Sequence, residues 1–247
     1  QIILDAIVAY RRMKNQGVVA VFQRDRFDQY SNFARIGEGS LGGKGRGLAF
    51  LDRMIKKVRE NEIEHADLLH IPKTLVLCTD IFDEFMETNE LYSIAMSDIS
   101  DEEMLACFLR GRLPHRLLAD LEVFIEVVKT PLAIRSSSLL EDSHYQPFAG
   151  IYSTYMIPYD EDKYCRLEML ANAIKGVYAS VYFRGSKDYM TATSNVIDQE
   201  KMAVILQEVV GQQYGTRFYP NVSGVARSVN YYPIGDEQAD EGIASLA

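Results

Sequence analysis

The chain has 247 residues, of which 47% are apolar and 25% are charged, and its formal net charge is −9 at pH 7. This composition predicts a globular protein with a sizeable core, built as one large domain or two lobes. The negative charge disfavours nonspecific nucleic-acid binding, because that binding depends mainly on Lys and Arg contacts with phosphates. No apolar run approaches the roughly 20 residues of a transmembrane helix. We therefore expect a cytoplasmic protein that binds neither nucleic acid nor a membrane.

The cysteines and histidines show no pattern typical of a disulfide framework or a metal site. Cys78, Cys107 and Cys165 are far apart and include no Cys-x-x-Cys pair. The four histidines lack the His-x-x-x-His and His-Glu-x-x-His spacings that place two ligands on one helix face. The sequence therefore predicts no metal ligand within this chain.

Helical and strand patterns alternate along the first half of the chain. Residues 1–30 open with an apolar and basic segment that begins without methionine, and we interpret them as an upstream connection. Apolar residues recur at intervals of three and four over 47–59, which predicts an amphipathic helix. The apolar run TLVLC then predicts a buried strand, and Thr79 or Asp80 is placed to cap the helix that follows.

The second half ends in strands. Helical spacing recurs over 101–130, up to Pro131, and over 160–193, with a strand expected at 132–135 between them. The runs MAVILQEVV and SGVARSVNYY predict two more strands, which we expect to pair as an antiparallel hairpin with a long tip. The order predicts an α+β fold, with an α/β N-terminal lobe at 31–200 and the start of a β-rich second lobe at 201–247.

The segment IGEGSLGGKGRG is unusually rich in glycine. Gly37, Gly39 and Gly42 match G-x-G-x-x-G, but no convincing strand precedes them, which disfavours a dinucleotide fold. A P-loop needs Lys at the position of Gly43, and the companion motifs of a protein kinase are missing from the chain. Backbone N–H groups, a helix N-terminus and Lys44 could still bind a phosphate. The alternative is a flexible turn with a solvated lysine.

A second segment, AIRSSSLLEDSHYQPFAGIYSTY, places a cation at the end of a strand. Arg135 can hold a phosphate in bidentate geometry, and the serines that follow it can donate hydrogen bonds to the same oxygens. Glu141 and Asp142 could orient the arginine. The alternative is a structural ion pair between Arg135 and one of these two carboxylates.

Taken together, these segments resemble a known family. The series GGKGRGLAFLDRM, IPKTLVLCTDIFDEFMETNEL, IRSSSLLEDSHYQPFAGIYSTYMI, VILQEVV and SGVARSVN is similar to the N-terminal nucleotide-binding domain of phosphoenolpyruvate synthase (pyruvate, water dikinase) and pyruvate phosphate dikinase. The resemblance runs from about residue 37 to residue 235. Its most specific part is the arginine-serine-serine, glutamate-aspartate and phenylalanine-alanine-glycine series.

The resemblance implies an ATP-grasp fold, in which two lobes clamp ATP and Mg²⁺. Lys44 and Arg135 would then be the catalytic residues that contact the phosphates. The family transfers a phosphoryl group from ATP to a carrier histidine on a separate domain, and from there to pyruvate on a pyruvate-binding domain of the same parent chain. The nucleotide-binding residues implied are Gly42, Gly43, Lys44, Gly45, Arg135, Ser136, Ser137, Gln207, Glu208, Val209 and Val210.

Some features depart from the family pattern. The acidic segment expected to hold magnesium does not occur in these residues, so we expect the chain alone to be catalytically incomplete. Arg227 stands where family members usually carry an apolar or aromatic residue, and Tyr178 stands where tryptophan is frequent. The alternatives are a degenerate ATP-sensing module, a related dikinase whose acceptor is a glucan or an antibiotic, and a binding protein with no nucleotide role.

Overall fold

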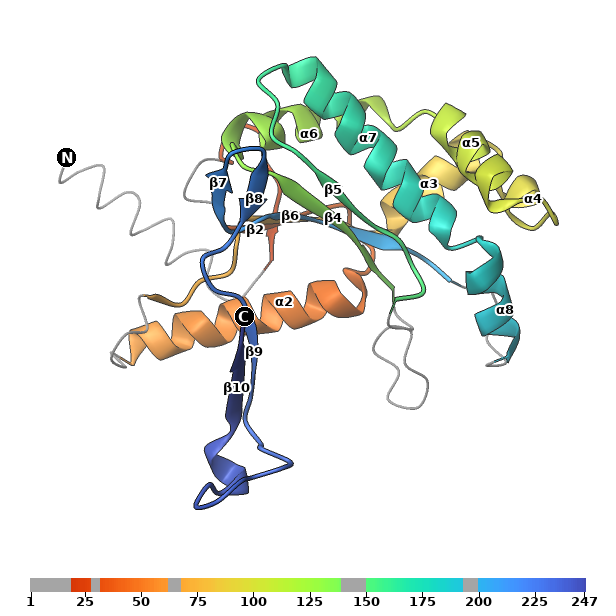
Figure 1. The fold of residues 1–247 in the computed structure, drawn as a ribbon. Coiled ribbons are helices and arrows are strands. Elements are labelled where there is room, and N and C mark those ends of the chain that lie inside the picture. The colour runs from red at the N-terminus through yellow and green to blue at the C-terminus, as the bar shows by residue number, and fades with distance from the viewer. Residues whose placement is uncertain (1–18, 28–31, 62–67, 139–149, 193–199) are drawn as a thin grey trace. The chain divides into compact units, whose positions relative to one another are not determined.

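The computed structural model describes residues 19–27, 32–61, 68–138, 150–192 and 200–247 (Figure 1). The chain divides into two compact units, residues 1–209 and residues 210–247. In the described residues, no helix combines the length and the apolar character needed to span a membrane.

The first unit contains a six-stranded mixed sheet in the order β1-β2-β3-β6-β4-β5. Strands β1, β2 and β3 are parallel to one another, whereas β6 runs antiparallel to both of its neighbours and β5 runs antiparallel to β4. The last strand of the unit in the sequence therefore lies near the middle of the sheet. The strands are β1 (Ala20–Val21), β2 (Phe33–Ile36), β3 (Thr74–Leu77), β4 (Leu132–Ser137), β5 (Thr154–Ile157) and β6 (Ala203–Glu208).

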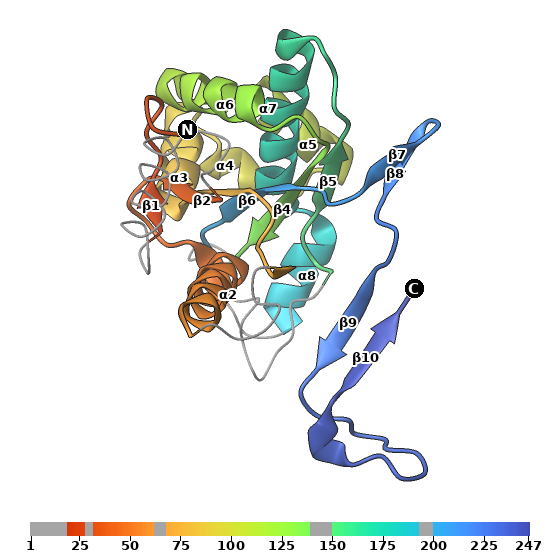
Figure 2. The same cartoon turned by 90° about the vertical axis from the view of Figure 1, so that its left-hand side faces the viewer.

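Helices cover both faces of this sheet, with α2 on one face and α3, α5, α6 and α7 on the other (Figures 1 and 2). Alternate strand residues serve the two faces, because successive side chains of a strand point in opposite directions. Leu75, Leu132 and Leu206 belong to the large core, while Val76 and Ile205 belong to a small cluster that includes Leu48 of α2. The helices are α2 (Gly42–Glu60), α3 (Thr79–Thr88), α4 (Tyr92–Ala95), α5 (Asp101–Arg110), α6 (His115–Val127), α7 (Lys163–Ser180) and α8 (Arg184–Ala192).

Three basic side chains bind carbonyl groups at, or just beyond, the C-terminal ends of neighbouring helices. Arg166 caps α6, Lys175 caps α5 and Lys187 binds just beyond α4, and burial lowers the pKa of each of these side chains. Cations at helix C-termini satisfy carbonyl groups that have no partner within the helix. The acceptors are the carbonyl oxygens of Ile125, Val128 and Thr130 for Arg166 (2.9, 3.0 and 3.4 Å), Leu109 for Lys175 (2.7 Å) and Ser97 for Lys187 (2.8 Å).

The second unit consists of two hairpins and a short 3₁₀ helix, η4 (Ala239–Glu241). Strands β7 (Gln212–Tyr214) and β8 (Arg217–Tyr219) pair antiparallel, and so do β9 (Gly224–Arg227) and β10 (Ile243–Leu246). The rings of Tyr214 and Tyr219 stack with their centroids 4.5 Å apart. Arg227 is the last residue of β9, where it pairs with Ile243.

The mixed sheet and its helices agree with the predicted α+β class, and three details of the sequence interpretation are wrong. The predicted hairpin does not form, because β6 pairs with β3 and β4 and β9 pairs with β10. The glycine-rich helix begins at Gly42 instead of near 47, and a strand, β2, does precede Gly37. The helical pattern over 101–130 is confirmed and forms two helices, α5 and α6. The two-lobe assignment stays a prediction. It places β6 in the second lobe, at 201–247, whereas β6 lies in the sheet of the first unit.

A first prediction concerns Tyr178, whose side chain is fully buried beside Phe82 and Phe85. Its hydroxyl has no hydrogen-bond partner among the described residues. Burial also raises the pKa of this phenol, so the hydroxyl stays neutral. Tyr178→Phe removes the unpaired group and should raise the free energy of unfolding by about 1 kcal/mol in urea denaturation. Tyr164→Phe, at an exposed position on the same helix, should leave it unchanged. A clear loss of stability in Tyr178→Phe would contradict this.

A second prediction concerns Arg166, which is only 2% exposed. Arg166→Met keeps much of the side-chain volume but leaves the carbonyl groups at the end of α6 without their donor. We expect the free energy of unfolding to fall by about 2 to 4 kcal/mol in urea denaturation. Lys163→Met is the matched control, because Lys163 is three residues away on α7 and forms ion pairs with Glu122 and Glu126 on the surface. Equal losses in the two variants would refute the capping role.

Candidate functional site

The glycine-rich segment connects β2 to α2 and is packed closely against β4. Gly42 has a φ of +68°, in the left-handed region, and a Cβ at this position would overlap the carbonyl oxygen of Ser137. A side chain is therefore excluded by both conformation and space. Gly42, Gly43 and Lys44 form the first turn of α2, so the lysine projects from the beginning of the helix.

The N-terminus of α2 is docked onto the end of β4 by hydrogen bonds. The amide of Gly43 donates to the Ser138 carbonyl (2.8 Å), and the amide of Gly45 donates to Ser137 Oγ (2.9 Å). The same Ser137 hydroxyl donates to the Leu41 carbonyl (2.8 Å), and Gly42 N donates to Ser40 Oγ (3.1 Å). These amides, which the sequence made candidates for anion binding, have protein acceptors in this structure.

The preceding residues of the glycine-rich segment are held by the beginning of α3. Asp80 accepts from two amides, one on each carboxylate oxygen, both at 2.9 Å, and Thr79 Oγ1 accepts from a third amide at 3.0 Å. The N-cap of α3 is Cys78, and it makes no side-chain cap. The predicted capping role of Thr79 or Asp80 is therefore wrong, because both side chains face the glycine-rich segment. The three donors are the amides of Glu38, Gly39 and Ser40.

Lys44 extends to the end of β4. Its Nζ donates to the carbonyl oxygen and to the hydroxyl of Ser136, each at 3.2 Å. Ser136 is the residue directly after Arg135, and it is almost fully buried. The ammonium group of Lys44 thus lies at the end of β4, the strand that carries Arg135, although the two residues are far apart in the sequence.

Arg135 lies on the sheet face that α2 partly covers. Its Nη1 donates to Gln207 Oε1 (3.3 Å), and Gln207 Nε2 donates to Thr74 Oγ1 (3.1 Å). The register explains this chain of contacts, because Gln207 pairs with Thr74 of β3 on one side and with Ala133 of β4 on the other. Gln207 thus links the guanidinium on β4 to Thr74 on β3.

The remaining predicted residues do not all join this group. The side chain of Glu208 accepts from Thr130 Oγ1 (3.0 Å) and from the Lys73 amide (3.4 Å), so it secures the strand end. The amide of Val209 donates to the Pro131 carbonyl at 2.9 Å. Val210 belongs to the second unit.

Glu141 and Asp142 lie outside the described residues. The predicted ion pair between Arg135 and one of these carboxylates therefore lies outside them too.

Sequence reasoning missed the contribution of Arg35 as well as the role of Asp80. Arg35 donates to the Gly37 carbonyl and forms an ion pair with Glu38 at 2.9 Å. Burial raises the pKa of the neighbouring Cys78 thiol to about 11, so the thiol stays protonated at neutral pH. The weak signal for these residues was their position at strand ends, which parallel β2 and β3 bring to the same edge of the sheet.

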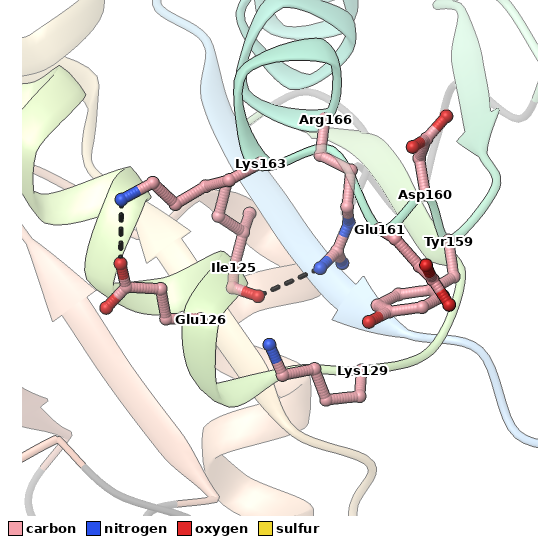
Figure 3. A pocket seen from close by; sticks show the side chains of 8 residues that line it. All are labelled: Ile125, Glu126, Lys129, Tyr159, Asp160, Glu161, Lys163 and Arg166. Carbon is pink, nitrogen blue, oxygen red and sulfur yellow. Dashed lines mark hydrogen bonds and ion pairs between the residues drawn. The ribbon is translucent and has the colours of Figure 1, made fainter.

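A small hollow of about 40 Å³ lies elsewhere, at the C-terminal end of α6 (Figure 3). Lys163 and Glu126 form an ion pair there, and Arg166 binds the Ile125 carbonyl. None of the predicted site residues lines it. Over the described ranges, no three His, Cys, Asp or Glu side chains are grouped so that they could hold a metal ion.

A comparison with models of protein families gives a match over most of the chain. Residues 38–243 match the family model of the pyruvate phosphate dikinase AMP/ATP-binding domain. The matched range includes residues 38–47 of the glycine-rich segment, β4 and β6, and therefore Lys44, Arg135 and Gln207. A search of curated proteins gave no match.

The packing of the glycine-rich segment generates a third prediction. Gly42→Ala should lower the free energy of unfolding by at least about 2 kcal/mol, because the added Cβ meets Ser137 and the backbone conformation disfavours alanine. Gly47→Ala is the control, since Gly47 lies on the same helix with open space around its Cβ position. It should raise stability by about 0.5 to 1 kcal/mol. Urea denaturation of both variants measures the difference, and similar values for both would contradict the docking described here.

Proposed function

The chain belongs to the pyruvate phosphate dikinase AMP/ATP-binding domain family, and from that premise we propose that it binds ATP with the phosphates at Lys44 and Arg135. The observation that carries the proposal is the contact of Lys44 Nζ with Ser136, the neighbour of Arg135 in β4. This contact brings the ammonium group to the end of β4, the same strand that carries Arg135. A polyphosphate is the ligand whose charge suits two such cations.

The two cations have different roles in the proposed site. Arg135 is held by Gln207, and its planar guanidinium can give two parallel hydrogen bonds to one phosphate. Lys44 binds two neutral oxygens of Ser136. A phosphate oxygen carries a negative charge that the Ser136 oxygens lack, so it would attract the ammonium group more strongly and draw it away from Ser136. Nucleotide binding would then reorient Lys44 without moving α2.

Such a site suits phosphoryl transfer, which depends on alignment and charge stabilisation more than on a protein nucleophile. We propose that the phosphoryl group passes to a carrier histidine on another domain of a parent protein, and from there to pyruvate. In this scheme the chain supplies nucleotide binding, and Lys44 and Arg135 stabilise negative charge on the transferred group. The acceptor histidine is not assigned to any residue of this chain.

The proposal includes Mg²⁺ as the companion of ATP, where it would neutralise phosphate charge. Magnesium takes oxygen ligands, chiefly carboxylates and phosphates. The carboxylate that contacts the glycine-rich segment, Asp80, uses each of its oxygens for a backbone amide. Over the described residues no three His, Cys, Asp or Glu side chains are grouped as metal ligands, and no step is assigned to the ion.

A fourth prediction tests nucleotide binding. Isothermal titration calorimetry with magnesium-ATP should show saturable binding to the protein, and Arg135→Ala should weaken it by about tenfold or more. Arg135→Lys should recover only part of the loss, because lysine cannot bind a phosphate in bidentate geometry.

Arg116→Ala provides the matched control for this experiment. Arg116 forms an ion pair with Glu84 and belongs to α6, on the other face of the sheet. Its removal should leave the affinity unchanged. No binding by the folded wild-type protein would refute the proposed function, and equal weakening by both alanine variants would refute the assignment to Arg135.

A further inference from the structure

We propose that Asp80 is a positioning residue that holds the glycine-rich segment, and through it Lys44, in the conformation that binds the phosphates. This inference rests on the proposed function. Asp80 receives two hydrogen bonds from consecutive amides of the segment, one on each oxygen, and both measure 2.9 Å. A carboxylate with two such partners determines the direction of the backbone that donates to it.

The glycines of the segment are matched to this carboxylate. A Cβ at Gly37 would overlap Asp80 Oδ1, and a Cβ at Gly39 would lie 2.6 Å from Thr79 Oγ1 and 2.7 Å from the Asp80 amide nitrogen. Gly37 also has a φ of +97°, which other residues rarely adopt. The glycines thus permit close contact with the beginning of α3.

Asp80 is itself supported by a rigid element. It lies in the first turn of α3, whose Ile81, Phe82 and Phe85 are at most 1% exposed in the large core. The turn is further joined to the segment by two backbone bonds, from Cys78 N to the Ile36 carbonyl (2.9 Å) and from Thr79 N to the Ser40 carbonyl (3.0 Å). A group on a well-packed helix can fix a loop more accurately than another loop could.

Lys44 is therefore held from two sides. Residues 38–40 are attached to α3, and residues 41–45 are attached to the end of β4 through Ser137 and Ser138. Removing the Asp80 carboxylate releases the first attachment and leaves the second. The lysine would then sample more positions, and a correctly placed ammonium group would be less populated.

The charge of Asp80 allows a clear test, because positioning and simple electrostatics predict opposite changes in ATP affinity when the carboxylate is neutralised. A carboxylate close to the phosphates repels them, so its neutralisation alone would tighten ATP binding. If Asp80 acts by positioning, neutralisation weakens ATP binding instead. The sign of the change in affinity therefore separates the two effects.

The test is a fifth prediction and combines calorimetry with amide hydrogen exchange. Asp80→Asn and Asp80→Ala should each raise the Kd for magnesium-ATP by about tenfold and speed exchange of the amides of residues 38–40 by at least about tenfold. Exchange in α7 should stay unchanged. Asp80→Glu, which keeps both oxygens, should recover most of the affinity. Asp83→Asn is the control, because Asp83 lies on the same helix and pairs with Lys201 on the surface.

The outcomes separate this inference from the proposed function. If the wild-type protein binds ATP but Asp80→Asn binds it equally well or more tightly, the positioning role is overturned and ATP binding stands. Unchanged exchange at residues 38–40 in Asp80→Ala also overturns it, whatever the affinity. If the folded wild-type protein binds no ATP, the proposed function fails and the inference fails with it.

Discussion

The buried hydroxyl of Ser137 is the contact on which the candidate site depends. It donates to the Leu41 carbonyl and accepts from the Gly45 amide, so that one side chain of β4 binds both sides of the first turn of α2. Because Ser137 is fully buried, the loss of either bond would leave a polar group without water to replace its partner. The close approach requires glycine at position 42. Lys44 reaches Ser136 only because its helix begins at this place.

This docking changes the role of the glycines. In many phosphate-binding loops, backbone amides contact the anion directly. Here six amides of the glycine-rich segment have acceptors within the protein, either at the beginning of α3 or in the segment itself and β4. The glycines allow close packing, and in the proposed site the anion is bound by the side chains of Lys44 and Arg135. The six donors are the amides of Glu38, Gly39, Ser40, Gly42, Gly43 and Gly45.

The sheet separates the candidate binding residues from the large hydrophobic core. On one face, leucines and isoleucines pack into the large core beneath helices whose C-terminal ends are capped by Arg166 and two lysines. The other face is covered by α2. Arg135 of β4 donates a hydrogen bond to Gln207 of β6. The alternation of side chains along a strand allows this separation, because neighbouring residues of one strand face opposite sides of the sheet. Ile134, next to Arg135 in β4, packs into the large core and thus anchors the strand that carries the arginine.

The sequence by itself determined the features that depend on local spacing: the helical character of 163–180, the buried strand TLVLC, the α+β class and, through its motifs, the family. It also identified Lys44 and Arg135 as candidates, since cations beside glycine or serine runs are visible in one segment. Only the tertiary structure decided that β6 lies between β3 and β4, and that Asp80 holds the glycine-rich segment instead of capping α3. Periodicity reports which face of an element is apolar, whereas the partner of a strand or a carboxylate depends on segments far apart in the chain.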